Sequence, residues 1–445
     1  MTARLHRGAL LHFLDDPATA GEDSYAYFPN GALLVEDGRI RAAGAADSVQ
    51  AQAPAGTAVV EHADALLIPG FIDTHVHYPQ LDIVGAHGEQ LLEWLERYVF
   101  PTEAKFGDYA YARTVAERFL TELLRNGTTT ALVFGTVHPE SVDAFFDAAQ
   151  ARDLRMIAGK VMMDRNAPAY LCDDPESAYR DSRRLIERWH GKGRASYAIT
   201  PRFAPTSSRE QLAAAGRLLN EFPGVYLHTH MSENVNEVSW VRELFPHTDH
   251  YLHSYDEAGL LGRRSVFAHC IHLSDAEWQR MAATGCGAAF CPTSNLFLGS
   301  GLFPLSEAER FGVEVGLGTD IGAGTSLSLL KTIDEAYKVQ QLRGTSLSPL
   351  KSFYLATLGA ARVLDLEDCL GNFLPGKEAD FVVLDLAATP LLANRLAHCE
   401  NLFETLFVLS TLGDDRCIRE TWVLGEARHD RHNELADQTA RALSL

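Results

Sequence analysis

The sequence has no hydrophobic run long enough to cross a membrane and no excess of basic side chains. No apolar stretch approaches the roughly 18 residues that a bilayer-spanning helix needs. The 39 lysines and arginines are outnumbered by 59 aspartates and glutamates, which gives a formal net charge of −20. Nucleic-acid phosphates and anionic lipids repel such a chain, so we expect neither nucleic acid nor a membrane as a partner.

Cysteine is sparse and follows no pattern. The seven cysteines are an odd number, are scattered between Cys172 and Cys417, and form no Cys-x-x-Cys pair. This is typical of reduced thiols rather than of a disulfide framework. The short apolar stretch near the N-terminus runs straight into Asp15 and Asp16, which argues against a secretory signal. We therefore expect a cytoplasmic protein.

Three catalytic signatures are also missing. His87-Gly-Glu89 supplies the His-x-Glu half of one zinc-deaminase signature, but its Pro-Cys-x-x-Cys half occurs nowhere. The Gly-x-Gly pairs that begin at Gly316 and Gly322 lack the third glycine of a dinucleotide-binding loop, and no Walker lysine follows them. A Gly-x-Ser-x-Gly elbow is absent as well. Nucleotide cofactors and a serine nucleophile are therefore not expected.

From about residue 66 onward, short β-rich runs alternate with longer stretches of helical periodicity. Several runs, such as 131–134, are continuously apolar over the length of a strand, as expected for strands that are buried on both faces. Strands separated by helices favour parallel pairing. The predicted strands are Gly70–His77, Thr129–Phe134, Met156–Met162, Ser196–Pro201, Val225–His230, Val266–His269, Gly287–Phe290 and Val313–Thr319. The clearest predicted helices are Tyr109–Arg125, Ala144–Ala151 and Gln211–Glu221.

Eight such strands predict an α/β fold of the (β/α)₈ TIM-barrel type. Turn-bounded, strand-like segments also occupy 31–67 and 376–426. We expect them to pair into one small composite β-sandwich domain, although strands that merely close the ends of the barrel are an alternative. The predicted boundaries assign 1–67 to the first part of that domain, 68–369 to the barrel, and 370–445 to the second part with a tail.

The most specific motif is Pro69-Gly-Phe-Ile-Asp-Thr-His75-Val-His77. Residues two apart in a strand point to the same face, so His75 and His77 place two imidazoles together. They do so at a strand end, where barrels keep their catalytic groups. Imidazole is a good ligand for Zn²⁺ or Fe²⁺. Two polar residues that simply face water are the alternative, but the pattern favours a metal site.

Three further predicted strands end in residues that can bind a metal. They carry His228-Thr-His230-Met-Ser-Glu233, His269-Cys and Gly318-Thr-Asp320. In a barrel, these strand ends converge on one rim. Three imidazoles and one carboxylate leave room for a water, as in catalytic rather than structural zinc sites. His228 and His230 share a face, so their spacing alone does not identify the ligand.

These motifs resemble those of the amidohydrolase superfamily, as does Gly376-Lys-Glu-Ala-Asp-Phe-Val-Val. The match runs from about Ile68 to the C-terminal strands and implies a barrel with a small β domain built from both chain ends. Other segments resemble the guanine-deaminating branch of that superfamily. They are Tyr78-Pro-Gln80, Gly88-Glu-Gln-Leu-Leu-Glu-Trp-Leu, Phe100-Pro-Thr-Glu, Thr200-Pro-Arg202-Phe203-Ala-Pro-Thr and Gly413-Asp-Asp-Arg416.

The resemblance implies one Zn²⁺ per chain as cofactor. Relatives with two metals hold them with a lysine at the end of the fourth strand, but Tyr197–Arg202 contains none. Lys160 lies on the third predicted strand and is expected to be a packing or loop-contact residue. His230 is preferred to His228 because it begins the His-x-x-Glu motif of the family. The implied metal ligands are His75, His77, His230 and Asp320.

The implied reaction is the hydrolytic deamination of guanine to xanthine and ammonia by a zinc-bound hydroxide. Glu233 corresponds to the proton shuttle, while His269 and Asp320 assist the attacking water. The implied substrate-binding residues are Gln80, Arg202, Phe203, His230 and Glu233.

Arg202 and Phe203 also have structural interpretations. An arginine suits the O6 and N7 edge of guanine, but Arg202 could instead form a surface salt bridge. Phe203 could stack on the purine or pack in the core.

The implied partners are the free guanine base, water and a second copy of the chain in a homodimer. One alternative is a mononuclear amidohydrolase that deaminates a pterin or an s-triazine, with the same metal ligands but differences at Gln80 and Arg202. A more distant alternative is a non-catalytic relative that serves as a scaffold. The segment Tyr78–Phe106 is positioned to act as a lid over the barrel mouth.

Overall fold

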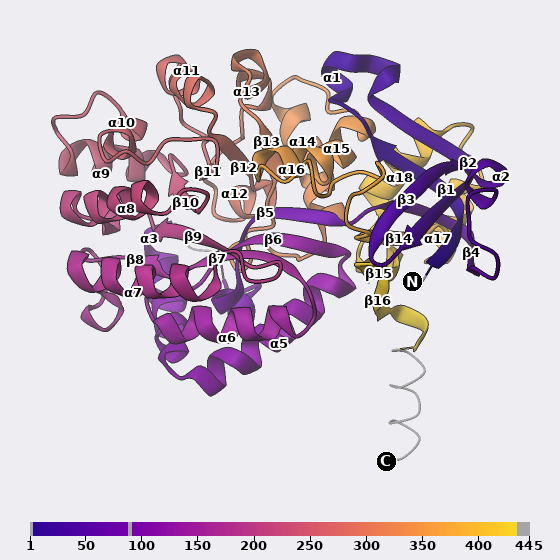
Figure 1. Cartoon of the computed structure of the whole chain (residues 1–445). Helices are drawn as coiled ribbons and strands as arrows, with labels where there is room; N and C mark the ends of the chain where they lie inside the picture. The colour runs from indigo at the N-terminus through magenta and orange to yellow at the C-terminus, as the bar shows by residue number, and fades with distance from the viewer. Residues whose placement is uncertain (1–2, 88–90, 434–445) are drawn as a thin grey trace.

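The computed structural model describes residues 3–87 and 91–433, which form a barrel joined to a separate sheet (Figure 1). The barrel strands are parallel and follow one another in chain order from β5 to β13. In the described ranges they are β5 (Phe71–His77), β6 (Thr128–Phe134), β7 (Arg155–Gly159), β9 (Ser196–Pro201), β10 (Tyr226–Met231), β11 (Ser265–His269), β12 (Gly287–Phe290) and β13 (Val315–Leu317). This confirms the predicted (β/α)₈ barrel.

The ring closes between the first and last strands. The main-chain N–H of Asp320 donates to the carbonyl of His75 at 2.9 Å, and that of His77 donates to the carbonyl of Ile321 at 2.9 Å. These bonds hold the segment after β13 against the end of β5. Closure therefore brings together two parts of the sequence that are about 245 residues apart.

Helices follow the strands and cover the outside of the barrel (Figure 1). α5 begins where the side chain of Asp108 caps two N–H groups, and it buries one apolar stripe that includes Phe119 and Leu123. The longer helices are α5 (Tyr109–Arg125), α6 (Pro139–Gln150), α7 (Pro175–Trp189), α8 (Arg209–Glu221), α9 (Val235–Leu244), α11 (Asp275–Thr284) and α14 (Leu329–Leu342). Shorter helices are α10 (Tyr251–Asp256), α12 (Pro292–Phe297), α13 (Leu305–Phe311), α15 (Pro349–Leu355) and α16 (Leu358–Val363).

The predicted third strand is wrong in one respect. It is interrupted at Lys160, which separates β7 from the short β8 (Val161–Met162). The main-chain N–H of Lys160 donates to the side-chain oxygen of Tyr197 in β9 at 3.2 Å instead of to a main-chain carbonyl. The helix predicted from Ala144 begins earlier, at Pro139. The prediction missed its first turn because buried polar residues there, such as Ser141, interrupt the apolar pattern.

Both ends of the chain contribute to a second, seven-stranded mixed sheet, as predicted for the composite domain. The ends meet where β4 pairs antiparallel with β14. The first strand, β1, lies outside the segments that sequence patterns indicated. In spatial order the strands are β16 (Glu426–Asp430), β15 (Ile418–Val423), β14 (Phe381–Asp385), β4 (Ala58–Pro69), β1 (Ala3–Phe13), β2 (Tyr25–Glu36) and β3 (Arg39–Ala45). The small helices α1 (Pro17–Ala20), α2 (Ala46–Gln50), α17 (Pro390–Leu396) and α18 (Leu402–Leu412) belong to the same terminal segments.

Gly70 joins this sheet directly to the barrel, between β4 and β5. A Cβ at this position would lie 2.2 Å from the hydroxyl oxygen of Thr129, so only glycine fits here without a shift. The barrel interior below the strand ends is apolar and includes Ile72, Leu132 and Ile157. The predicted domain boundaries at 67 and 369 stay predictions.

The segment between β5 and α5 folds mainly as short helical turns, including α3 (Leu91–Trp94) and α4 (Phe100–Glu103). Residues 88–90, which fall within one of the motifs of the family resemblance and include Glu89, lie outside the described residues. Within the described ranges, no helix combines the length and the apolar character needed to cross a bilayer.

Candidate active site

Four side chains that the sequence assigned to a metal converge at the carboxyl ends of the barrel strands. His75 and His77 end β5, His230 lies in β10, and Asp320 follows β13. One ligand atom from each lies within 4.8 Å of all the others. Oδ1 of Asp320 is 3.1 Å from Nε2 of His75 and 3.4 Å from Nε2 of His77. Nε2 of His77 is also 3.1 Å from Nε2 of His230.

This arrangement fits a bound cation. Burial, followed by the neighbouring histidines, lowers the pKa of His77 well below its usual value. Burial and His75 likewise lower the pKa of His230. Nε2 of His75 is buried and forms no hydrogen bond within the described residues, although Oδ1 of Asp320 lies 3.1 Å away. Neutral imidazole nitrogens that gather around one carboxylate are a donor set for a metal such as Zn²⁺.

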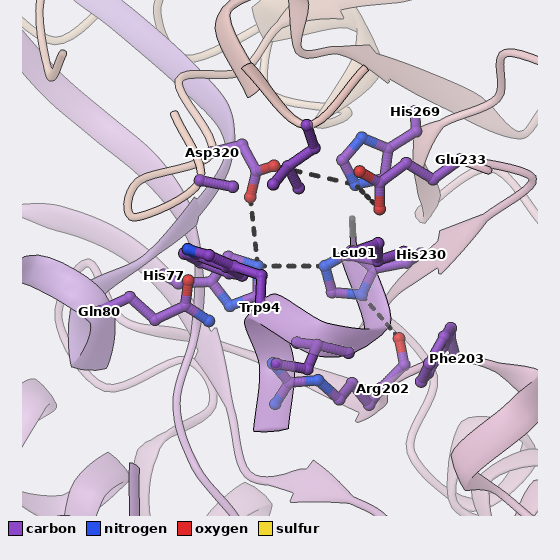
Figure 2. A pocket seen from close by; sticks show the side chains of 13 residues that line it. His77, Gln80, Leu91, Trp94, Arg202, Phe203, His230, Glu233, His269 and Asp320 are labelled. Carbon is purple, nitrogen blue, oxygen red and sulfur yellow. Dashed lines mark hydrogen bonds and ion pairs between the residues drawn. The ribbon is translucent and has the colours of Figure 1, made fainter. Parts of the chain in front are cut away.

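Two hydrogen bonds orient the imidazoles. Nδ1 of His230 donates to the carbonyl of Arg202 at 2.7 Å, which leaves Nε2 facing the cluster (Figure 2). Nδ1 of His75 lies 2.7 Å from Nε2 of His228. The structure therefore separates the two candidates that spacing left open. His230 belongs to the cluster, whereas the fully buried His228 supports His75 from behind.

Asp320 lies in a backbone conformation that a non-glycine residue seldom adopts. Its φ is 50°, and His269 has a φ of 75°. Such strain is concentrated at functional sites, where the surrounding structure enforces it. Burial alone would raise the pKa of Asp320, but His75 and His269 together keep that pKa below its ordinary value. Asp320 is therefore a carboxylate at neutral pH.

Glu233 and His269 lie beside the cluster of His75, His77, His230 and Asp320 (Figure 2). Nε2 of His269 is 3.5 Å from Oε2 of Glu233 and 3.9 Å from Oδ2 of Asp320. Burial, together with Asp320 and Glu237, raises the pKa of Glu233 well above its ordinary value. The raised pKa favours the protonated form of Glu233, which can donate a proton.

Two residues that the sequence did not single out hold this pair in place. The hydroxyl of Ser300 donates to Oε1 of Glu233 at 3.0 Å. Nδ2 of Asn295 lies 2.9 Å from Nδ1 of His269. Both follow β12 in helical or loop segments, where no apolar periodicity or ligand spacing marked them.

A pocket of about 400 Å³, part of it open to solvent, lies against the cluster. Polar and apolar side chains both line it, and the apolar Leu91 and Trp94 come from α3 (Figure 2). All the predicted substrate-binding residues are on its wall. The lining comprises His77, Gln80, Leu91, Trp94, Leu95, Arg202, Phe203, His230, Glu233, His269, Leu298, Asp320 and Ala323.

Arg202 is not a surface residue, because its side chain is only 4% exposed. Its Nη1 donates to Oε2 of Glu103 at 2.8 Å, and Glu103 is buried as well. Phe203 lines the pocket and packs in an apolar cluster with Trp94, which supports the core-packing interpretation, and its stacking on a purine stays a prediction. Lys160 pairs with Asp173 and is not among the cluster residues, as expected.

The chain is similar to known proteins over nearly its whole length. The profile of the "Amidohydrolase family" matches residues 66–428. Guanine deaminase of Escherichia coli strain K12 is 55% identical over 406 residues, which cover 91% of this chain and 92% of that protein. A solved structure of E. coli guanine deaminase has a TM-score of 0.93 and 51% identity, and the match covers 97% of this chain and all of that one.

A second solved structure, guanine deaminase from C. acetobutylicum with guanine bound in its active site, has a TM-score of 0.86 and 30% identity. That match covers 96% of this chain and 99% of the other. The similarity therefore includes the barrel, the composite sheet and the pocket region together.

Proposed function

The chain belongs to the amidohydrolase family, and we propose that it hydrolyses free guanine to xanthine and ammonia. The observation that carries this proposal is that residues of the His/His/His/Asp cluster line the same pocket as Glu233 and Arg202. Guanine deaminase of Escherichia coli, which is 55% identical over 91% of this chain, supports the choice of guanine.

We propose a single Zn²⁺ per chain, held by His75, His77, His230 and Asp320. When bound there, zinc lowers the pKa of a coordinated water from 15.7 to about 7, which makes a nucleophile available at neutral pH. A single ion is proposed because β9 has no lysine to bridge a second one. Iron would accept the same ligands, so the identity of the metal needs direct analysis.

Glu233 is the proposed proton donor. Its raised pKa favours the protonated form, which can protonate ring nitrogen N3 next to the C2 carbon that carries the amino group. Asp320, which is ionised, accepts a proton from the attacking water. Glu233, now ionised, can take the proton of the C2 hydroxyl as the C2 carbonyl forms and pass it to the departing amine, and the proton held by Asp320 then returns to Glu233. His269, which lies close to both carboxyl groups, can hydrogen-bond to the oxygen that forms on C2.

Arg202 and Gln80 are the proposed readers of the base. Both line the pocket and both are nearly fully buried. The Arg202 guanidinium can donate to the O6 and N7 edge of guanine, where adenine presents an amino donor at C6 instead. Phe203 supplies an apolar wall for the flat ring.

The test is ammonia release from guanine, adenine, cytosine and a pterin, each measured with and without a chelator. We expect turnover of guanine alone at a substantial rate, and loss of that turnover on chelation. Preferential turnover of a pterin or an s-triazine would favour the alternative amidohydrolase activity. An absence of turnover in the metal-loaded protein would favour the scaffold alternative.

Metal analysis tests the proposed stoichiometry separately. We expect about one zinc ion per chain, and two would contradict the mononuclear site. The homodimer and the cytoplasmic location expected from the sequence stay predictions. Mass measurement in solution and cell fractionation would check them.

A further inference from the structure

Glu103 lies between the two proposed readers of the base and has no role in the chemistry described above. It is the last residue of α4 and is only 1% exposed. Its Oε1 accepts a hydrogen bond from Nε2 of Gln80 at 3.1 Å. Its Oε2 accepts one from Nη1 of Arg202 at 2.8 Å. One buried carboxylate therefore holds both side chains.

The same helical turn contacts Arg202 a second time. The guanidinium carbon of Arg202 lies 5.8 Å from the centre of the Phe100 ring, which is buried. Phe100 and Glu103 are three residues apart in α4, a spacing that places side chains on one helix face. α4 thus offers Arg202 both a counter-charge and an aromatic face.

Glu103 also fixes the orientation of the Gln80 amide. Oε1 of Gln80 accepts a hydrogen bond from the main-chain N–H of Gly322 at 3.1 Å, while its Nε2 faces Glu103. A reversed amide would place its oxygen against the carboxylate and its NH₂ group against the N–H of Gly322. Only one orientation therefore satisfies both neighbours.

This orientation determines which polar hydrogens remain for a ligand. Gln80 keeps one N–H that is not used by Glu103. The bond from Arg202 to Glu103 uses one of the five guanidinium N–H groups. This side of the pocket consequently has hydrogen-bond donors to offer, and a ring edge that carries acceptors complements it.

We propose that Glu103 is a positioning residue that sets the specificity of the pocket for an acceptor-bearing purine edge. The proposal rests on the proposed function, because it concerns how guanine is selected. Guanine presents O6 as an acceptor, whereas 2,6-diaminopurine has the same 2-amino group but an amino donor at C6. Without the Glu103 carboxylate, only the N–H of Gly322 opposes reversal of the Gln80 amide, so a reversed amide that accepts a hydrogen bond from that amino group becomes accessible.

The test is Glu103→Gln, which keeps the shape of the side chain but cannot accept hydrogen bonds from both neighbours. We expect the KM for guanine to rise roughly tenfold or more, with kcat changed by less than about threefold. We also expect the ratio of kcat/KM for guanine to that for 2,6-diaminopurine to fall roughly tenfold or more. Zinc content should be unchanged, because none of the four cluster residues bonds to Glu103.

Glu378→Gln is the matched control. Glu378 is a buried acid that pairs with Arg155 and Arg194, and it touches no residue of the pocket wall. This substitution should lower Tm but leave the KM for guanine and the substrate ratio unchanged. If Glu103→Gln likewise lowers Tm but leaves the KM for guanine and the substrate ratio unchanged, Glu103 has only a structural role and the proposal is wrong.

Glu103→Asp provides a second measurement if the glutamine variant does not fold. Aspartate keeps the charge but is one methylene shorter, so it cannot reach both Gln80 and Arg202 in the same geometry. The substrate ratio should again fall, and an unchanged ratio would overturn the proposal. A wild-type protein that releases no ammonia from guanine would contradict the proposed function itself, which is a distinct result.

Discussion

Nδ1 of His230 donates to the main-chain carbonyl of Arg202 at 2.7 Å, so one residue contacts both the metal cluster and the pocket. The carbonyl of Arg202 sets the tautomer of His230, which leaves Nε2 available to a metal. The side chain of Arg202 meanwhile lines the pocket beside Gln80 and Glu103. The proposed metal binding and the proposed base recognition are therefore adjacent but depend on different atoms of Arg202.

This separation predicts the effect of Arg202→Ala. The main-chain carbonyl survives the substitution, so zinc content should be retained. Loss of the guanidinium removes charged hydrogen bonds to the base, and the KM for guanine should rise roughly 10- to 100-fold. Steady-state kinetics and metal analysis of the same preparation check this. A variant that loses its zinc would show that Arg202 has a structural role at the cluster.

Glu233→Gln should keep the metal and lose most of its turnover. Glutamine retains the size of the side chain and can still accept the hydrogen bond from Ser300. It cannot donate a carboxyl proton, so we expect kcat to fall by about 10²- to 10⁴-fold. Ammonia release by zinc-loaded protein measures the effect. Turnover close to that of the wild type would remove Glu233 from the proton transfers.

His228→Ala should weaken zinc binding without abolishing it. His228 is not in the cluster, but it holds the imidazole of His75 through a 2.7 Å contact. Loss of such a supporting partner typically reduces metal affinity roughly 10- to 100-fold. Competition with a chromogenic zinc chelator measures the change.

Ile157→Ala is the control for that variant. Ile157 packs in the apolar interior of the barrel, so its truncation removes buried volume but no support for a metal ligand. The control should lower Tm while zinc affinity stays near that of the wild type. Equal losses of affinity in both variants would mean that His228 acts only through packing.

The composite sheet predicts a dependence of stability on pH. His6 and His62 are buried there, with Nδ1 of His6 3.0 Å from Nε2 of His62. Burial, with help from His62, lowers the pKa of His6 to about 3. Burial, with help from Arg419, lowers the pKa of His62 to about 4. Between these values and the ordinary pKa of 6.5, the unfolded chain binds more protons than the folded one.

The free energy of unfolding should therefore fall as the pH drops below 6.5, by up to about 1.4 kcal/mol per pH unit for each of the two histidines. His62→Gln removes one of these groups, so its stability should decline less steeply between pH 6.5 and 5. Denaturant unfolding of both proteins at several pH values checks this. Both carry the same metal site, so its own pH dependence cancels in the difference, and parallel curves would contradict the prediction.

Much of the barrel could be predicted from local patterns. β9 and α5 have the predicted bounds, because an apolar strand and an amphipathic stripe are properties of consecutive residues. The pairing of His75 with His77 follows in the same way from the two-residue period of a strand. The interruption at Lys160 was not predictable, since it depends on the hydroxyl of Tyr197 from the next strand of the barrel.

The sequence by itself determined which strand ends carry residues able to bind a metal, and with them the rim of the barrel on which a metal site was predicted. Only the tertiary structure decided that His230 belongs to the cluster while His228 supports it from behind. It alone also placed Glu103 against Arg202, 99 residues further along the chain. The physical reason is that backbone periodicity is short-ranged, whereas the choice between two residues on one face depends on what the closed barrel brings opposite them.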